Sequence, residues 1–157
     1  LSETAAGAGQ PQLVYKLMEC ATASAVWNTR KGAAFALAAH SHDELRAHLP
    51  KLVPTLYRHT FDPNPKVGVA MRQLWAALIP EPKVVLLEHL PAVLEHLRAG
   101  LADRLWRTRE ASSCGLAELL PGRSLPEIRD HVAPLHVLLM RALDDVKETV
   151  RKAALGA

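Results

Sequence analysis

The eight histidines are the residues of this chain best suited to bind a metal ion. His40 and His42 lie close together, yet no HExxH pattern occurs and no two imidazoles are spaced one helical turn apart. His48, His89 and His131 recur at intervals of 41 and 42 residues, as the structural positions of a repeat do. The histidines therefore predict no metal site and no bound cofactor.

A second group with chemical potential is Ser112, Ser113 and Cys114, whose hydroxyl and thiol groups are candidate nucleophiles. These residues lie in the middle of an expected helix, without a GxSxG elbow or a glycine-rich oxyanion turn. None of the eight glycines forms a P-loop or Rossmann pattern. An enzyme on a helical scaffold would need polar groups that converge on a pocket, and no such set is evident. We predict no catalytic residue and no small-molecule substrate.

The bulk composition favours a helical globular chain. Hydrophobic residues make up 49% and charged residues 22% of the 157, whereas aromatic residues make up only 4%. The net charge of +3 is spread over scattered cations without a run of five like charges, which predicts no nucleic-acid partner. No apolar run approaches the ~20 residues that span a bilayer, which predicts no membrane insertion. Cys20 and Cys114 are isolated cysteines, which is typical of proteins in a reducing compartment.

A short skeleton repeats along the chain and predicts its architecture. An aspartate is followed eight residues later by an alanine in three places, and the aspartates lie 41 and 42 residues apart. The pairs are Asp62 and Ala70, Asp103 and Ala111, and Asp145 and Ala153. Self-similarity at this period is typical of HEAT-type arrays, in which each helix pair needs a neighbour to cover its apolar face. The prediction is an all-α fold, an α-solenoid of about four antiparallel helix pairs.

Apolar periodicity and turn signals divide the chain further. Residues 1–10 are small and polar, which predicts a flexible lead, and 11–157 form the HEAT-repeat array segment. The expected helix pairs are 11–40, 43–79, 82–120 and 125–157.

Three local signals define helix starts and bends. Asn64 and Pro65 predict a capped helix start, and Ser124 with Glu127 has the spacing of a capping box. Pro91 is expected inside a helix that begins near residue 82, where it should cause a kink.

The repeated aspartates are expected to form a ladder between helix pairs. A basic residue follows two of them six positions later, so that it can bond to a neighbouring repeat, while the aspartates cap exposed N–H groups at the helix starts. The structural ladder consists of Asp62, Asp103, Arg109, Asp145 and Arg151.

Trp106 is the candidate for contact with a protein partner. It lies just after a turn and is flanked by Arg104 and Arg107. A solvent-facing tryptophan among arginines is a typical protein-binding hot spot, although packing inside the array is the alternative.

The segments around these turns also carry a family resemblance. They are Tyr15 to Met18, Trp27 to Phe35, Leu105 to Ser112 and Asp144 to Arg151, with Gly122-Arg123 after the sixth expected helix. In this order they resemble the family of large eukaryotic HEAT-repeat proteasome adaptor and scaffold proteins. The resemblance covers most of 13–155, and because the array motif is still present at the last residues we expect an internal fragment of such a protein or a processed chain.

The resemblance implies a non-enzymatic scaffold that binds the 26S proteasome and links or stabilises its core and regulatory particles. It implies a cytoplasmic and nuclear protein. A second hypothesis is a tubulin-binding or transport-adaptor type of helical-repeat module, in which the turns present Trp106, Arg104 and Arg107 to a partner. An enzyme on a helical-repeat scaffold is the third hypothesis.

Overall fold

The computed structural model describes residues 49–157, and in this range it contains seven helices and no strand. The helices are α5 (Leu49–His59), α6 (Pro65–Leu78), α7 (Pro82–Glu88), α8 (Leu90–Leu101), α9 (Trp106–Leu119), α10 (Leu125–Leu143) and α11 (Glu148–Ala154). The prediction of an all-α fold is confirmed for these residues. The expected lead 1–10 and helix pair 11–40 lie outside the described range.

Two helix starts form as the local sequence predicts. The side chain of Asn64 accepts a hydrogen bond from the N–H of Lys66, and Pro65 opens α6 at a position where no N–H is needed. At the start of α10, the Glu127 carboxylate accepts hydrogen bonds from both the N–H and the hydroxyl of Ser124. These hydrogen bonds hold the pKa of Glu127 below its ordinary value.

The prediction of one kinked helix around Pro91 is wrong. The chain forms α7 up to Glu88, breaks at His89, and starts α8 at Leu90. Pro91 therefore lies in the first turn of α8, where its missing N–H leaves no hydrogen bond unmade. The prolines that do lie inside helices are Pro54 in α5 and Pro134 in α10.

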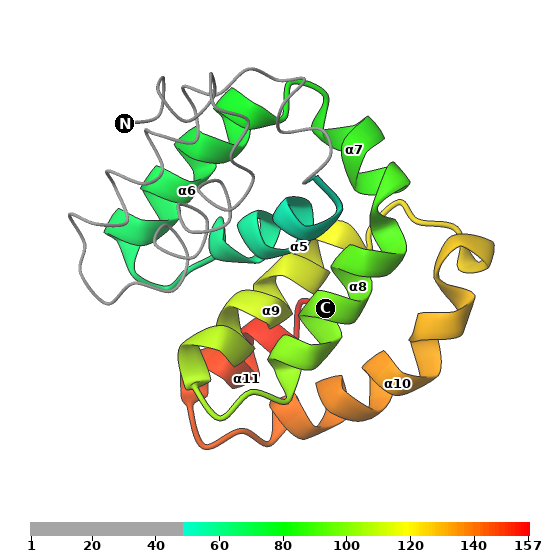
Figure 1. Ribbon diagram of the computed structural model, residues 1–157. Helices are drawn as coiled ribbons and strands as arrows, with labels where there is room; N and C mark the ends of the chain where they lie inside the picture. The colour runs from blue at the N-terminus through cyan, green and yellow to red at the C-terminus, as the bar shows by residue number, and fades with distance from the viewer. Residues whose placement is uncertain (1–48) are drawn as a thin grey trace.

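The helices pack in successive pairs (Figure 1). Helix α5 contacts α6, α8 contacts α9, and α10 contacts α11. Helix α8 also contacts both α5 and α10, whereas α9 contacts α5 and α11. The α8–α9 pair is thus the middle layer, and in Figure 1 α6 and α10 lie on opposite sides of it. No helix of the described part is long and apolar enough to cross a membrane.

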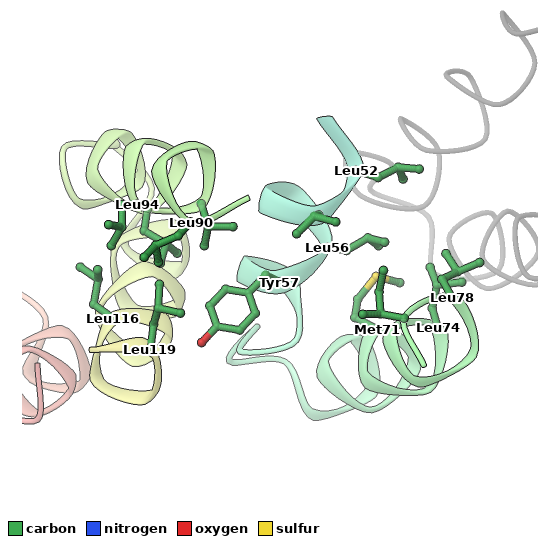
Figure 2. Packing of buried hydrophobic residues seen from close by; sticks show 14 of the residues in the cluster. Leu52, Leu56, Tyr57, Met71, Leu74, Leu78, Leu90, Leu94, Leu116 and Leu119 are labelled. Carbon is green, nitrogen blue, oxygen red and sulfur yellow. The ribbon is translucent and has the colours of Figure 1, made fainter. Parts of the chain in front are cut away.

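Most of the core lies around α5 (Figure 2). Leu52 and Leu56 face Met71, Leu74 and Leu78 of α6 on one side. On the other side of α5, Figure 2 shows Leu90 and Leu94 of α8 beside Leu116 and Leu119 of α9.

Tyr57 joins these two halves of the core. Its ring makes edge-on contacts with Phe61 and Trp75, with centroids 5.2 and 5.7 Å apart, and its hydroxyl donates a 3.1 Å hydrogen bond to the Gly115 carbonyl. Burial raises the pKa of Tyr57, so the phenol stays protonated and remains a donor.

A second, smaller apolar cluster joins α9, α10 and α11. Ala142, Val150 and Ala154 are buried, and Trp106 and Leu143 pack against them. The contact of α11 with α9 is therefore made by small side chains and one indole, whereas α10 adds Leu135 to the main core.

Helices α8 and α9 lie in tight contact at Gly100. A Cβ atom at this glycine would stand 2.1 Å from the hydroxyl oxygen and 3.2 Å from the Cβ of Ser112, so a larger residue would displace the Ser112 side chain and crowd its Cβ. The Ser112 hydroxyl is fully buried and makes no hydrogen bond within the described part of the chain. Its neighbour Ser113 donates to the carbonyl of Arg109 instead.

We predict that Gly100→Ala lowers the free energy of unfolding. Overpacking costs about 1–3 kcal/mol, which outweighs the gain of up to about 1 kcal/mol from the better helix propensity of alanine. Ser112→Ala should be neutral or stabilising, because it removes a hydroxyl without a partner, and it should rescue part of the loss in the double variant. Urea unfolding measures the free energy of unfolding of the two single variants and the double variant.

Gly156→Ala is the matched control, because its new methyl would lie at an ordinary 3.4 Å from the Cβ of Ala117. A Gly100→Ala variant as stable as the parent would refute the close approach of α8 and α9.

Candidate functional site

The turns within the three helix pairs share one backbone geometry. In each turn the aspartate carboxylate accepts a hydrogen bond from the N–H two residues later, which ends the turn and orients the next helix. The bonds are Asn64 to Asp62 at 2.8 Å, Leu105 to Asp103 at 2.7 Å and Lys147 to Asp145 at 2.9 Å. The three predicted ladder aspartates thus occupy equivalent positions in successive pairs.

Arg109 connects two of these turns through a single guanidinium. Its Nη1 donates to the carbonyl oxygens of Asp103 and Arg104 in its own turn, both at 2.9 Å. Its Nε and Nη2 donate to the two carboxylate oxygens of Asp145, at 2.6 and 3.0 Å. These two parallel hydrogen bonds form the Arg109–Asp145 fork. The side chains of Arg109 and Asp145 are only 16% and 8% exposed, so the fork is largely shielded from water.

The electrostatics of this pair follow from the same fork. The hydrogen bonds from Arg109 hold the pKa of the Asp145 carboxyl below its ordinary value, and the bond to Asp145 raises the pKa of Arg109. Both groups are therefore charged at neutral pH, and their ion pair links α9 to the α10–α11 turn.

The other turns use the same carbonyl contact with different partners. Arg151 donates from Nη1 to the carbonyl of Asp145 at 2.6 Å, as Arg109 does in the preceding turn. In the first turn the equivalent position is Gly68, and Arg72 donates instead to the Thr60 carbonyl at 2.8 Å. A Cβ at Gly68 would stand 3.1 Å from the Arg72 guanidinium, so the glycine leaves room for it.

Arg58 lies at the contact between the first two described pairs. Its Nε donates to Nε2 of His96 on α8 at 3.2 Å, which requires a neutral imidazole as acceptor. Burial lowers the pKa of Arg58, and the charge of Asp103 opposes this effect. The guanidinium of Arg58 on α5 thus lies near Asp103. In the α5–α6 pair, the position equivalent to Arg109 is occupied by Gly68.

Trp106 is half-buried rather than fully exposed. The indole packs on the small cluster around Val150, while cations lie over its ring. The Nζ of Lys147 is 4.9 Å and the guanidinium carbon of Arg107 is 5.4 Å from the ring centroid. Arg104 and Arg107 are exposed beside it. The structure thus brings Trp106 and Arg107 into contact and leaves both arginines available to a partner.

The exposure of two apolar side chains at the same turns was not predicted. Leu105 is 60% exposed and Val146 is 91% exposed, each within two residues after a ladder aspartate. Together with Arg104, Trp106, Arg107 and Lys147 they form the turn edge, the candidate contact surface of this chain. Leu105 is the second residue after its aspartate and Val146 the first, so no shared repeat position marked them in the sequence.

The described residues offer little to catalysis. No group of three or more histidine, cysteine or acidic side chains could hold a metal ion in 49–157. Burial raises the pKa of the Cys114 thiol, which makes it a poor nucleophile. The hydroxyl of Ser113 is used in its bond to the Arg109 carbonyl.

Comparison with known proteins identifies relatives of the whole chain. No family model and no solved structure matches it. The human proteasome adapter and scaffold protein ECM29 is 43% identical over 157 residues, which cover 98% of this chain. The Saccharomyces cerevisiae proteasome component ECM29 is 36% identical over 92% of the chain, and the Drosophila melanogaster proteasome-associated protein ECM29 homolog is 29% identical over 99%. The chain belongs to the ECM29 family.

The matched ECM29 segment is a small part of each relative. The chain spans 8% of the length of the human and yeast proteins and 10% of that of the fly protein. The family resemblance noted from the turn segments is thereby confirmed.

We predict that Arg109→Ala and Asp145→Ala are strongly coupled. Each should lower the free energy of unfolding by about 1.5–3 kcal/mol, because each leaves a shielded charge without its partner. The double variant should cost less than the sum of the two, with a coupling energy of about 1–2 kcal/mol. Chemical denaturation of the four proteins measures the cycle. The exposed pair of Glu148 and Lys152, 2.7 Å apart, is the control and should be nearly additive.

We predict that His96 makes the fold sensitive to mild acid. Burial, reinforced by the charge of Arg58, lowers the pKa of His96 from 6.5 to about 4. Between these values the unfolded chain binds a proton at this site and the folded chain does not, so the free energy of unfolding falls as the pH drops from about 6.5 to about 4.

His96→Gln keeps an acceptor for Arg58 and removes this titration, so its stability should fall less steeply over that pH range. Urea unfolding at several pH values measures the slope, with His136→Gln on the exposed side of α10 as the control. Equal slopes for His96→Gln and the parent would contradict the assignment.

Proposed function

We propose that this chain is one segment of a non-enzymatic HEAT-repeat scaffold that binds the 26S proteasome. The observation that carries the proposal is its 43% identity to the human proteasome adapter and scaffold protein ECM29 over 98% of the chain. The scaffold would link or stabilise the core and regulatory particles of the proteasome. It would act in the cytoplasm and the nucleus.

The geometry of the turns supports a solenoid of about four helix pairs. Three turns with the same aspartate bond lie in successive pairs, and the fork of Arg109 on Asp145 joins one pair to the next. Repeated units that contact mainly their neighbours build long surfaces rather than closed pockets. Such a surface is suited to holding a large assembly.

The turn edge is the part of this segment that we assign to the partner. Protein contacts are typically anchored by aromatic and arginine side chains with apolar neighbours, and here Trp106, Arg104 and Arg107 lie beside Leu105 and Val146. The packing of Trp106 inside the array holds the turn in place, so the exposed arginines would provide the contact.

A charge-reversal experiment tests this contact. The immobilised 157-residue chain should capture purified 26S proteasome at low salt, and Arg104→Glu with Arg107→Glu should reduce the captured amount by about tenfold or more. The matched control is Lys83→Glu with Arg129→Glu, which makes the same charge change on exposed residues of α7 and near the start of α10. Capture that is absent in the parent, or equal in both variants, would contradict the turn-edge assignment.

The second candidate is a tubulin-binding or transport-adaptor module, favoured by the exposed arginines beside Trp106. Co-sedimentation of the chain with microtubules at low salt separates the two. Binding that is lost in the same double variant, without capture of proteasome, would favour this alternative.

A further inference from the structure

Three cations of the turn edge have no anionic partner within the described range. The side chains of Arg104, Arg107 and Lys147 are exposed, and none of them forms an ion pair with another residue in 49–157. By contrast, Arg109 lies two residues farther along α9 and is paired with Asp145. The positive charge of the turn edge is therefore available to a group from outside the chain.

The charge of the turn edge does not serve the stability of the helix that carries it. Arg107 lies in the first turn of α9, where the helix macrodipole disfavours a cation. The same turn contains no acidic residue, and Arg104 adds a second cation just before the helix begins. A residue type that is unfavourable for the fold at its own position indicates a functional contact.

The turn edge is held in one conformation before any partner binds. The Nζ of Lys147 and the guanidinium of Arg107 both lie over the ring of Trp106, which restrains two otherwise mobile side chains. The backbone beside them is fixed as well, because Asp103 accepts the hydrogen bond from the N–H of Leu105. Restraint of these groups lowers the entropy cost of binding an anionic partner.

Apolar side chains lie directly next to these cations. Leu105 follows Arg104 in the chain, Val146 precedes Lys147, and both apolar side chains are more than half exposed. A ligand with anionic groups alone would leave them in contact with water. A ligand that matches the whole turn edge carries carboxylates together with an apolar side chain.

This combination is not a general product of the repeat. When the turns are aligned at their aspartates, Pro63 and Asn64 occupy the places of Arg104 and Leu105 in the first described turn. Neither of the two carries a charge, and Asn64 caps α6 instead. Helix α9 has packed neighbours on both sides, α5 and α11, so the exposure of Arg104 and Leu105 does not result from a missing neighbour.

Exposed carboxylates near the turn edge favour a polypeptide over a nucleic acid as its ligand. Asp144 and Glu148 are exposed and lie on either side of Lys147 in the sequence. They would repel a phosphate backbone, which carries a negative charge at every nucleotide. An acidic peptide can place its carboxylates opposite the cations and an uncharged residue opposite Asp144 and Glu148.

We propose that the turn edge binds a short acidic segment of polypeptide. Its carboxylates pair with Arg104, Arg107 and Lys147, and an apolar side chain of the segment packs on Leu105 and Val146. The proposal rests on the assignment of the turn edge to the partner of the scaffold, and it adds the chemistry of the partner segment.

Fluorescence anisotropy with labelled peptides tests this proposal on the 157-residue chain. The probe is a short peptide that alternates pairs of glutamates with single leucines. One control peptide has serine in place of every leucine, and another has lysine in place of every glutamate. The glutamate–leucine peptide should bind at low salt, the serine peptide should bind about fivefold more weakly, and the lysine peptide should not bind. Added salt should weaken the binding.

Two double variants assign the binding to the turn edge. Arg104→Gln with Lys147→Gln should weaken the binding of the glutamate–leucine peptide by about tenfold or more, because two charge-assisted contacts are lost. Leu105→Ser with Val146→Ser should weaken the binding of this peptide by about fivefold and leave that of the serine peptide unchanged.

The matched control is Lys83→Gln with Arg129→Gln, which removes the same charge from exposed residues of α7 and α10. It should bind the glutamate–leucine peptide like the parent. All the replaced side chains are exposed, so each variant should keep the helical circular dichroism of the parent.

Three results would overturn the proposal. The first is equal binding of the glutamate–leucine peptide by the parent and by Arg104→Gln with Lys147→Gln. The second is equal binding of the leucine and serine peptides, which would remove the apolar contact. The third is tighter binding of a single-stranded DNA oligonucleotide of the same charge, lost in the same variant, which would make a nucleic acid the ligand.

Competition separates this proposal from the proposed function. Excess glutamate–leucine peptide should release 26S proteasome from the immobilised chain, and excess lysine peptide should not. Proteasome capture that the peptide does not reduce would overturn the acidic segment and leave the scaffold role standing. Peptide binding with the expected variant effects, but without capture of proteasome, would support the acidic segment and exclude the proteasome as its source.

Discussion

The structure of the last two helix pairs depends on the guanidinium of Arg109, which binds its own turn and the next one at the same time. Two nitrogens bind Asp145, and the third binds the carbonyls of Asp103 and Arg104. Every charged group in this fork has hydrogen-bond partners, which offsets the cost of removing the charges from water. Since the fork is planar and bidentate, it sets both the distance and the angle between neighbouring turns.

The capping of two helix starts was predictable from the sequence. Asn64, Pro65, Ser124 and Glu127 act within one helical turn, so their types and spacing were enough to predict the helix starts. The effect of Pro91 was misplaced because a proline can either kink a helix or open a new one, and the sequence does not decide between the two. The close approach of Gly100 to Ser112 depends on how two helices cross, which the period of one helix does not specify.

The candidate site was predictable in part for the same reason. The spacing of Asp103, Arg109 and Asp145 pointed to equivalent positions, and the structure brings Arg109 and Asp145 together. Trp106 was read as either packed or exposed, and it is half-buried because α11 supplies the cluster on which it rests. The exposure of Leu105 and Val146 was not predicted, since a single apolar residue at a turn carries no periodic pattern.

Gly68 occupies the position in the α5–α6 pair that Arg109 occupies in the α8–α9 pair. The two contacts between neighbouring pairs, here called joints, therefore differ from each other. The joint of α5 with α8 and α9 combines a broad apolar core around Leu56 and Tyr57 with single hydrogen bonds from Tyr57 to Gly115 and from Arg58 to His96, and it has no bidentate ion pair within the described residues. The joint of α9 with α11 has a small apolar cluster and a directional fork. Helices packed through apolar side chains can slide slightly against each other, whereas a planar fork resists displacement. When this part of the chain is bent, the α5 joint would therefore yield more easily than the joint of α9 with α11.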